Sequence, residues 1–348
     1  MPFLALLFLL PGATMPSDTT TISRIADGVY VFLEHNTTDD WVDGNTTAIL
    51  TDEGVFVVDA PSVRLSRKHL ETIRSLTDKP VRYLVNTHWH NDHLLGNQVY
   101  KEANPDLQII ASSRTKEISD LRNPSVIAKY AGDFGDTLYA DIVKAAETGR
   151  TADGEEMSEY DHSRAMKSFH QAQMDMPLIK ETRYTPPTMT FDSSLNLELG
   201  GRRIEIKRMP GHTQGDAVVY LPDDKILITC DLVIHPVPYG FGPYFSSWIE
   251  TLKALMAIDA TTIVPGHGEI LHSDDYLQLE RELFSDLLDQ ARKAVLEGKT
   301  VEQFKAEIDV SRYREIMVGD DPDREWGFEN YFLAPGIGRI FDDAKGAY

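Results

Sequence analysis

The chain has 348 residues, of which 42% are hydrophobic and 26% are charged, a composition typical of a folded globular protein with a large core. Its formal net charge of -21 argues against nucleic acid or an anionic membrane as a partner, because both would be repelled. The single cysteine, Cys230, excludes a disulfide within the chain.

The first twenty residues contain an apolar run from Phe3 to Leu10, followed by a Pro-Gly-Ala step and a polar stretch. The run is too short to span a bilayer, and it resembles the hydrophobic region of a secretory signal peptide. No Lys or Arg precedes it, which departs from that pattern. We therefore expect a signal peptide at residues 1–20 and a periplasmic or secreted protein, with a cytoplasmic protein as the alternative if translation starts at Met15.

From residue 22 onward, short runs of β-branched and aromatic residues predict strands at 28–33, 46–50, 54–59, 81–85, 107–111, 195–199, 203–206, 217–221, 225–228 and 262–264. Apolar residues at helical spacing predict helices at 66–76, 248–258 and 276–296, and a further helix that begins at residue 113. Ser66 is the expected N-terminal cap of the first of these helices. The polar stretch from about 123 to 187 is helical in pattern. It predicts a helical insertion in a domain that otherwise runs from 22 to 348 as one unit.

The most informative segment is the loop that follows the predicted strand at 81–85. It places His88, His90, Asp92 and His93 within six consecutive residues. In a tight turn, the first two side chains can face one point while the last two face a neighbouring point. Imidazole and carboxylate groups gathered at two adjacent points favour a site for two metal ions.

Three more ligand-type side chains follow other predicted strands. His212 lies in a Gly-His pair, Asp231 comes directly after Cys230, and His267 lies in a second Gly-His pair. The glycines allow the backbone to turn sharply beside each histidine. Four strand ends therefore each deliver a side chain that can bind a metal.

These motifs occur in the order His-x-His-x-Asp-His, Gly-His, Asp, Gly-His, and the pattern resembles the metallo-β-lactamase superfamily over roughly residues 25 to 275. The resemblance implies an α/β fold of four layers, an αββα sandwich, in which two sheets face each other and helices cover both outer faces. It also implies two metal sites. The first would be held by His88, His90 and His212, and the second by Asp92, His93 and His267, with Asp231 bridging both.

Zinc is the expected metal, two ions per chain, with iron or manganese as alternatives for the same donor set. Two such ions would lower the pKa of a shared water to about 7, so a bridging hydroxide would be available to attack a carbonyl. We therefore expect a metal-dependent hydrolase that opens an ester, lactone, thioester or β-lactam-like amide, with Asp92 also orienting the nucleophile. The family register favours Asp231 over the adjacent Cys230 as a ligand, which favours a broad hydrolase over a dedicated β-lactamase.

Three segments are expected to border the substrate, namely the helical insertion and two loops. Residues 235–242 are rich in Pro and aromatic residues, and His235 or Tyr239 in this segment is a candidate catalytic donor to the oxyanion, with a packing role as the alternative. In the family, the loop at residues 35–45 overhangs the metals, so its Trp41 either packs on substrate or anchors the loop. His162 and His170, in the insertion, are expected to be surface histidines.

Two alternatives come from other functional classes. A persulfide dioxygenase of the same superfamily uses a mononuclear iron with much the same residues, and a non-catalytic metal-binding module would keep the fold without turnover. The completeness of the set of seven ligands argues against the second. We expect a small-molecule substrate and neither nucleic acid nor membrane as a partner, and the sequence leaves the oligomeric state open.

Overall fold

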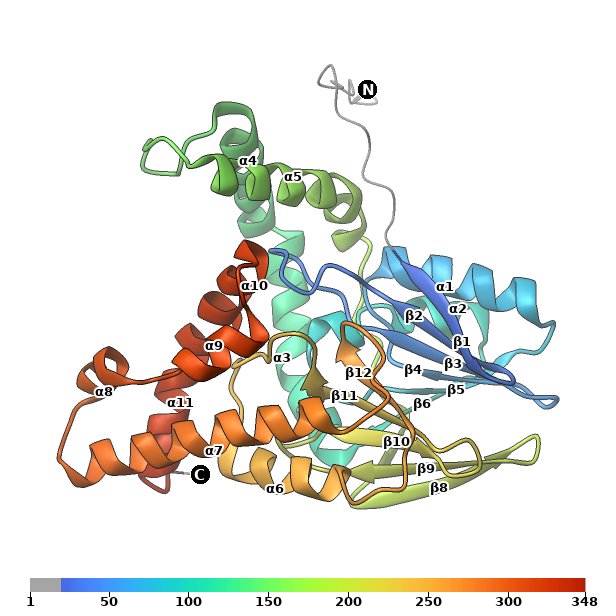
Figure 1. Ribbon diagram of the computed structural model, residues 1–348. Helices are drawn as coiled ribbons and strands as arrows, with labels where there is room; N and C mark the ends of the chain where they lie inside the picture. The colour runs from blue at the N-terminus through green and yellow to red at the C-terminus, as the bar shows by residue number, and fades with distance from the viewer. Residues whose placement is uncertain (1–19, 348) are drawn as a thin grey trace, which may run out of the picture.

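The computed structural model describes residues 20–347, and within them two β-sheets face each other while helices cover the outer face of each sheet (Figure 1). The α/β sandwich predicted from the sequence is therefore confirmed. The first sheet has the strand order β1-β2-β3-β4-β5-β6-β7. Its strands are β1 (Thr21–Ala26), β2 (Val29–Leu33), β3 (Thr46–Leu50), β4 (Val55–Val58), β5 (Val81–Val85), β6 (Gln108–Ser112) and β7 (Met189–Phe191). Neighbours are antiparallel from β1 to β4 and parallel from β4 to β7.

The second sheet has the order β12-β11-β10-β9-β8. Its strands are β8 (Ser194–Leu199), β9 (Arg202–Arg208), β10 (Ala217–Leu221), β11 (Ile226–Ile234) and β12 (Thr262–His267). Only the β11/β12 pair in this sheet is parallel. Both β11 and β12 therefore run toward the same edge of the sheet, where their last residues meet.

Helices α1 (Val63–Leu76) and α2 (Asn97–Ala103) cover the first sheet, and α6 (Phe245–Leu255) and α7 (Asp275–Leu296) cover the second (Figure 1). Three helices, α3 (Ser113–Ala131), α4 (Asp133–Thr148) and α5 (Glu159–Ile179), extend away from the sandwich. The C-terminal part forms α8 (Val301–Glu307), α9 (Ser311–Met317), α10 (Pro322–Gly327), the π-helix η2 (Phe328–Leu333) and α11 (Ala334–Ala344). No helix in residues 20–347 is long and apolar enough to cross a membrane.

Alternation along the strands builds the core between the sheets. In β9, Ile204 and Ile206 are buried while Arg203, Glu205 and Lys207 are exposed, which is the two-residue period of a strand with one face on the core. The inward residues of both sheets form one apolar cluster, which includes Val31, Ile49, Phe56, Val219 and Ile228. This dry layer fixes the two sheets against each other and so fixes the strand ends that carry the polar loops.

Most predicted strands and helices are present, with two informative differences. Ser66 does not cap α1, because the helix begins at Val63 and the side chain of Ser62 accepts a hydrogen bond from the Leu65 amide at 3.4 Å. Ser66 is instead fully buried, in the helix face that packs on Gly96. Strand β11 does not end before Cys230 but runs on to Ile234, with an irregular register around Cys230, whose φ is 48°.

The predicted insertion at about 123–187 contains the end of α3 and all of α4 and α5. The aromatic C-terminal segment docks on the body, since Phe328 and Phe332 are buried against α6 and α7. The predicted signal peptide falls on residues that lie outside the described part of the chain, apart from Thr20.

Candidate metal centre and substrate cavity

The seven predicted ligands meet at one edge of the sandwich, where loops from both sheets come together. The first sheet supplies the loop after β5, in which residues Asn91–His93 form a single turn of 3₁₀ helix. The second sheet supplies the loop between β9 and β10, the irregular part of β11 and the last residue of β12. Long-range packing of the two sheets therefore brings together side chains that lie up to 179 positions apart, from His88 to His267.

One group of four side chains, His88, His90, His212 and Asp231, offers ligand atoms that all lie within 4.8 Å of one another. The Nε2 atom of His212 lies 2.9 Å from Nδ1 of His90 and 3.4 Å from Oδ2 of Asp231. Nε2 of His88 lies 3.5 Å from the same Asp231 oxygen. These are the residues that the family resemblance groups around the first metal, together with its bridging aspartate.

A second group contains Asp92, His93 and His267, again within 4.8 Å. Nε2 of His267 lies 3.2 Å from Oδ2 of Asp92, and the two imidazole Nε2 atoms lie 3.3 Å apart. Asp231 reaches this group as well, because its Oδ1 lies 3.2 Å from Nε2 of His93. The carboxylate of Asp231 thus lies between the two groups, and the ligand roles of all seven residues remain predictions.

The donor set fits divalent metal ions. Nε2 of His88 is buried, and no hydrogen-bond partner for it is found among the described residues. Burial lowers the pKa of His88, and it lowers those of His90 and His212 to about 3 and about 4. These three imidazoles are therefore neutral, which is the form that binds a metal. Neutral nitrogen donors beside carboxylate oxygens are the ligands that zinc prefers.

The other half of the centre holds protons when no metal is bound. Burial lowers the pKa of His267, but the carboxylates of Asp231 and Asp92 outweigh that effect and raise it to about 9. The pKa of His93 is also raised, because the carboxylates around it, Asp231 first among them, and Cys230 overcome the effect of its burial. Two protonated imidazoles, His93 and His267, and two carboxylates, Asp92 and Asp231, are thus buried together. In the metal-free chain the protons compensate the negative charge that a bound cation would otherwise compensate.

Beneath the ligands lies a layer of polar side chains that holds the imidazoles in position. Asp59 accepts hydrogen bonds from Nδ1 of His93 at 2.9 Å and from the amide and hydroxyl of Thr87 at 2.8 and 2.7 Å. With Nδ1 bound in this way, Nε2 of His93 points to the ligand cluster. The sequence analysis missed Asp59, although an Asp directly after the apolar strand β4 was a usable signal.

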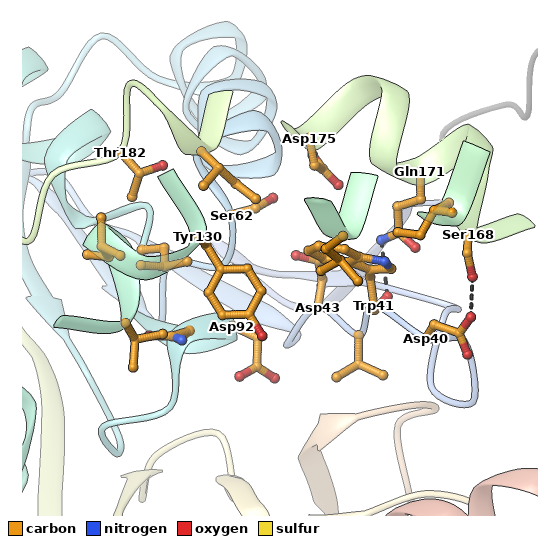
Figure 2. A pocket seen from close by; sticks show the side chains of 18 residues that line it. Asp40, Trp41, Asp43, Ser62, Asp92, Tyr130, Ser168, Gln171, Asp175 and Thr182 are labelled. Carbon is orange, nitrogen blue, oxygen red and sulfur yellow. Dashed lines mark hydrogen bonds between the residues drawn. The ribbon is translucent and has the colours of Figure 1, made fainter. Parts of the chain in front are cut away.

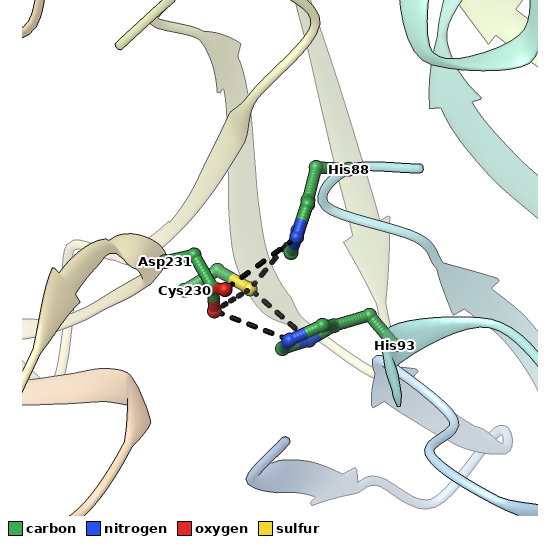
Figure 3. Close-up of side chains that lie close together, drawn as sticks. All are labelled: His88, His93, Cys230 and Asp231. Carbon is green, nitrogen blue, oxygen red and sulfur yellow. Dashed lines mark hydrogen bonds and ion pairs between the residues drawn. The ribbon is translucent and has the colours of Figure 1, made fainter. Parts of the chain in front are cut away.

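Cys230 belongs to this lower layer. Its Sγ donates to Asp59 at 2.9 Å and lies 3.4 Å from Nδ1 of His93, on the side of the ring away from Nε2 (Figure 3). Burial raises the pKa of the thiol, so it stays protonated and acts as a donor. Cys230 has a positive φ, and the side chain of the next residue, Asp231, lies between the two ligand groups.

Two other polar residues fix the loops of the second sheet. Asp216 accepts hydrogen bonds from the amides of Gly211 and Thr213, on either side of His212, at 3.0 and 2.7 Å. Asn45 donates to the carbonyls of Pro265 and Gly268, which flank His267, at 3.1 and 2.9 Å. Neither residue was recognised in the sequence, because each acts through a turn whose shape no local pattern reveals.

A cavity of about 650 Å³ adjoins the cluster, between the loop that precedes β3 and helices α3, α4 and α5 (Figure 2). This volume lies in the usual range for small-molecule sites. Asp92 is the one predicted ligand on its lining, beside Asn91 of the same loop. The rest of the lining is largely apolar or aromatic and includes Val42, Leu95, Val126, Ile127, Leu138, Ile142 and Ile179.

The predicted pocket residues are only partly where they were expected. Trp41 lines the cavity and stacks edge-on against Tyr130, while its carbonyl accepts hydrogen bonds from Asn36 and Gln171, so it both borders the cavity and anchors its loop. Tyr239 packs its ring 5.0 Å from that of His267, but its hydroxyl donates to the carbonyl of Thr37 at 2.6 Å. That hydroxyl is therefore engaged, and the geometry does not support its role as an oxyanion donor.

His235 lies against Tyr276, with ring centroids 4.9 Å apart, and belongs to none of the ligand groups. None of residues 235–242 lies on the lining of the 650 Å³ cavity, contrary to our expectation for this segment. His162 and His170 are both half-buried on α5, and Nε2 of His162 lies 2.8 Å from the carbonyl oxygen of Ala146. His162 therefore packs against α4, whereas His170 is a partly exposed residue of α5.

Comparisons with known proteins bear on the family and the fold of the chain. A linear primary-alkylsulfatase from a Pseudomonas strain is 25% identical over 278 residues, which are 74% of this chain and 48% of that protein. Among solved structures, a stereoselective inverting sec-alkylsulfatase from Pseudomonas superposes with a TM-score of 0.63 at 18% identity, covering 94% of this chain and 51% of that one. The chain thus spans about half the length of the two alkylsulfatases that it matches.

A metallo-beta-lactamase from Pontibacter korlensis superposes with a TM-score of 0.52 at 20% identity, covering 76% of this chain and 99% of that one. At this identity the likeness concerns the fold. The family profile of the metallo-beta-lactamase superfamily matches residues 39–267, which contain both sheets from β3 onward and all seven predicted ligands. The chain therefore belongs to the metallo-β-lactamase superfamily.

Proposed function

We propose that this protein is a hydrolase with two zinc ions that attacks the carbonyl group of an ester, lactone, thioester or amide. The bond cleaved joins the carbonyl carbon to the leaving oxygen, sulfur or nitrogen, and the substrate also carries an apolar group. The observation that carries the proposal is the position of Asp92. It belongs to the second ligand group and also lines the apolar cavity, so a substrate held in the cavity reaches the ligand cluster at this residue.

His88, His90, His212 and Asp231 would hold one ion, and Asp92, His93 and His267 the other, with Asp231 shared. Two bound zinc ions supply Lewis acidity and lower the pKa of a shared water. The chain itself supplies the orientation. The carboxylate of Asp92 can accept a hydrogen bond from the attacking water, and the apolar lining keeps bulk water from the rest of the substrate.

A second candidate is the hydrolysis of an alkyl sulfate ester. It is supported by the similarity to the linear primary-alkylsulfatase over 74% of this chain and by the apolar character of the cavity, which suits an alkyl chain. The two candidates differ in the atom that the water attacks. In the first it is the carbonyl carbon, and in the second it is the sulfur of the sulfate group or the alkyl carbon bonded to the ester oxygen. A substrate panel separates them.

The test is elemental analysis of the purified chain beside turnover of a chromogenic ester, a lactone, a thioester, a β-lactam and an alkyl sulfate. We expect about two zinc ions per chain and hydrolysis of at least one carbonyl substrate. The His212→Ala variant should lose on the order of a thousandfold in kcat/KM, because a metal contributes several kcal/mol to the transition state. A His170→Ala variant on α5 is the matched control and should keep wild-type turnover. A single iron with oxygen consumption and no hydrolysis would overturn the proposal in favour of a dioxygenase.

A further inference from the structure

The charged side chains that form the lining of the cavity are all acidic. Its lining contains four aspartates, Asp40, Asp43, Asp92 and Asp175, and no Lys, Arg or His occurs among the described residues that line it. An anionic group inside the cavity would therefore have four carboxylates near it and no cation on the lining to meet it.

Three of the four aspartates already have a cationic or ligand-group partner. Asp40 accepts from Nη2 of Arg164 at 2.7 Å, and Asp175 accepts from Nε of Arg64 at 2.6 Å. Asp92 lies 3.2 Å from His267 in the ligand cluster. The charges of these three are compensated by neighbours of the chain itself, so they need nothing from a ligand.

Asp43 differs from the other three. Only 5% of it is exposed, yet it lines the cavity, and within residues 20–347 it makes no ion pair. Its Oδ2 accepts from Nδ2 of Asn36 at 3.3 Å, whereas no hydrogen bond of its Oδ1 is found among these residues. In Figure 2 Asp43 stands beside Trp41, in the part of the cavity that also faces Asp175. A buried carboxyl with an open oxygen in an apolar cavity is a group that can bind a ligand donor.

We propose that the cavity selects substrates whose apolar group carries no negative charge, and that Asp43 is a specificity-determining residue. The carboxyl of Asp43 accepts a hydrogen bond from a hydroxyl, amide or ammonium group at the far end of that apolar group. This inference rests on the proposed hydrolase function, since it names the class of substrate for the same site. Burial favours the neutral form of the Asp43 carboxyl and raises its pKa to about 7, so an ammonium group would favour the charged form and a hydroxyl would be accepted by either.

The competing explanation is that Asp43 only shapes its loop. Its backbone amide donates to Oδ1 of Asn36, whose Nδ2 also donates to the Trp41 carbonyl at 2.8 Å. A purely structural role would affect every substrate equally, because it would move the whole loop. A specificity role changes the ratio between substrates that differ only in their far end.

The experiment uses the zinc-loaded full chain and a matched series of nitrophenyl esters. The acyl groups are hexanoyl, ω-hydroxyhexanoyl, ω-aminohexanoyl and the monoacyl group of adipic acid. The last three place a hydroxyl oxygen, an ammonium nitrogen and a carboxylate oxygen at the same chain position, one atom beyond the terminal methyl carbon of the hexanoyl group. Wild-type kcat/KM should be at least tenfold lower for the carboxylate-tailed ester than for the hexanoyl ester, and highest for the hydroxyl- or ammonium-tailed ester. Asp43→Asn should reduce the ammonium-to-carboxylate ratio at least tenfold, whereas the matched control Asp153→Asn, in the exposed turn after α4, should leave it unchanged.

The corresponding primary amides, titrated calorimetrically into the same protein, give a second readout that does not depend on turnover. They share one head group, so their order of affinity reports on the tails alone. If no ester in this series or carbonyl substrate of the panel is hydrolysed, the proposed function fails, while the order of amide affinities still tests the cavity. Equal affinity for all tails, or an Asp43→Asn variant that lowers all four rates in proportion, would overturn the inference and leave the hydrolase proposal standing.

Discussion

Asp59 accepts the Nδ1 proton of His93 at 2.9 Å, and this contact fixes which nitrogen of the imidazole faces the ligand cluster. The contact joins the end of β4 to the loop after β5, two neighbouring parallel strands of the first sheet. Asp59 has a φ of 61°, an uncommon conformation for a residue other than glycine, and it is 1% exposed. The fold therefore holds a strained, buried carboxylate in place to orient one histidine.

Replacing Asp59 by Asn should weaken metal binding by about 10- to 100-fold, because the amide accepts less strongly and presents a donor to the Nδ1 side of the ring. Competition with a chromogenic chelator measures the affinity, and circular dichroism checks that the sheets persist. Asp52→Asn, in the turn between β3 and β4, is the control and should bind metal as the wild type does. Unchanged affinity in the Asp59→Asn variant would show that the contact does not orient His93.

Gly44 is expected to tolerate no side chain. A Cβ at this position would lie 2.3 Å from Cε1 of His93, so either the imidazole or the loop must move. We expect Gly44→Ala to lower metal affinity at least about tenfold, roughly 1.4 kcal/mol, with little change in the stability of the rest of the fold. Gly338→Ala is the matched control, because a Cβ at this position in α11 meets nothing within 4 Å. Isothermal titration with zinc compares the two variants.

Metal binding should release protons at neutral pH. In the metal-free chain the pKa of His267 is about 9, so its imidazole is protonated at pH 7 and must lose a proton to bind a metal. Metal affinity should therefore fall as the pH is lowered from 9, by about tenfold per pH unit for each proton released. Calorimetric titrations in buffers of different ionisation enthalpy count the protons. A binding enthalpy that is independent of the buffer would contradict the prediction.

Glu280 should make the stability of the protein depend on pH. It is fully buried in α7, and burial raises its pKa well above the usual 4.5, so the folded state favours the neutral acid. Below pH 4.5 the carboxyl is neutral in both the folded and the unfolded state, so burial of Glu280 does not reduce the free energy of unfolding. That free energy falls as the pH rises from 4.5 toward the folded-state pKa, because the unfolded state can then ionise while the folded state cannot. The non-ionising variant Glu280→Gln should thus gain stability over the wild type as the pH rises, by about 1.4 kcal/mol per unit of raised pKa that is titrated.

Urea unfolding at acidic and mildly alkaline pH measures this difference. Glu282→Gln is the control on the same helix, because Glu282 is partly exposed and hydrogen-bonded to Arg312 at 2.8 Å. Its free energy of unfolding should differ from the wild type by less than about 1 kcal/mol at either pH. A gap between Glu280→Gln and the wild type that stays constant with pH would show that the carboxyl does not titrate in this range.

The sheets and the ligand cluster could be predicted because their signals are local. Alternation in β9 and the apolar run of β5 each identify a strand without knowledge of the partner strand, and the motif of residues 88–93 contains four of the seven candidate ligands. The resemblance to a family then supplied the pairing of loops that lie far apart in the sequence. Residue spacing alone would not have placed His267 next to Asp92.

The supporting residues could not be predicted because their contacts are long-range. Asn45 acts on the turn around His267, more than 200 positions away, and nothing in its own neighbourhood indicates this. Tyr239 was one of two candidate donors, with a packing role as the alternative, and the fold directs its hydroxyl to the carbonyl of Thr37. The charge of the cavity likewise depends on which aspartates meet Arg64 and Arg164, and these pairs join the first helix and the loop before β3 to α5.

The seven candidate ligands all lie on loops and strands of the sandwich, whereas much of the cavity wall belongs to α3, α4 and α5. Of these three helices, α3 touches the loop of residues 88–93 through Asn123, which donates to Trp89 and Asn91. Changes in α4, and at those positions of α5 that do not anchor the loop before β3, can therefore alter which molecules are accepted while the candidate ligands keep their positions. A lineage of such proteins can acquire new substrates by varying one segment of the chain, and laboratory evolution of selectivity would begin with residues 133–179.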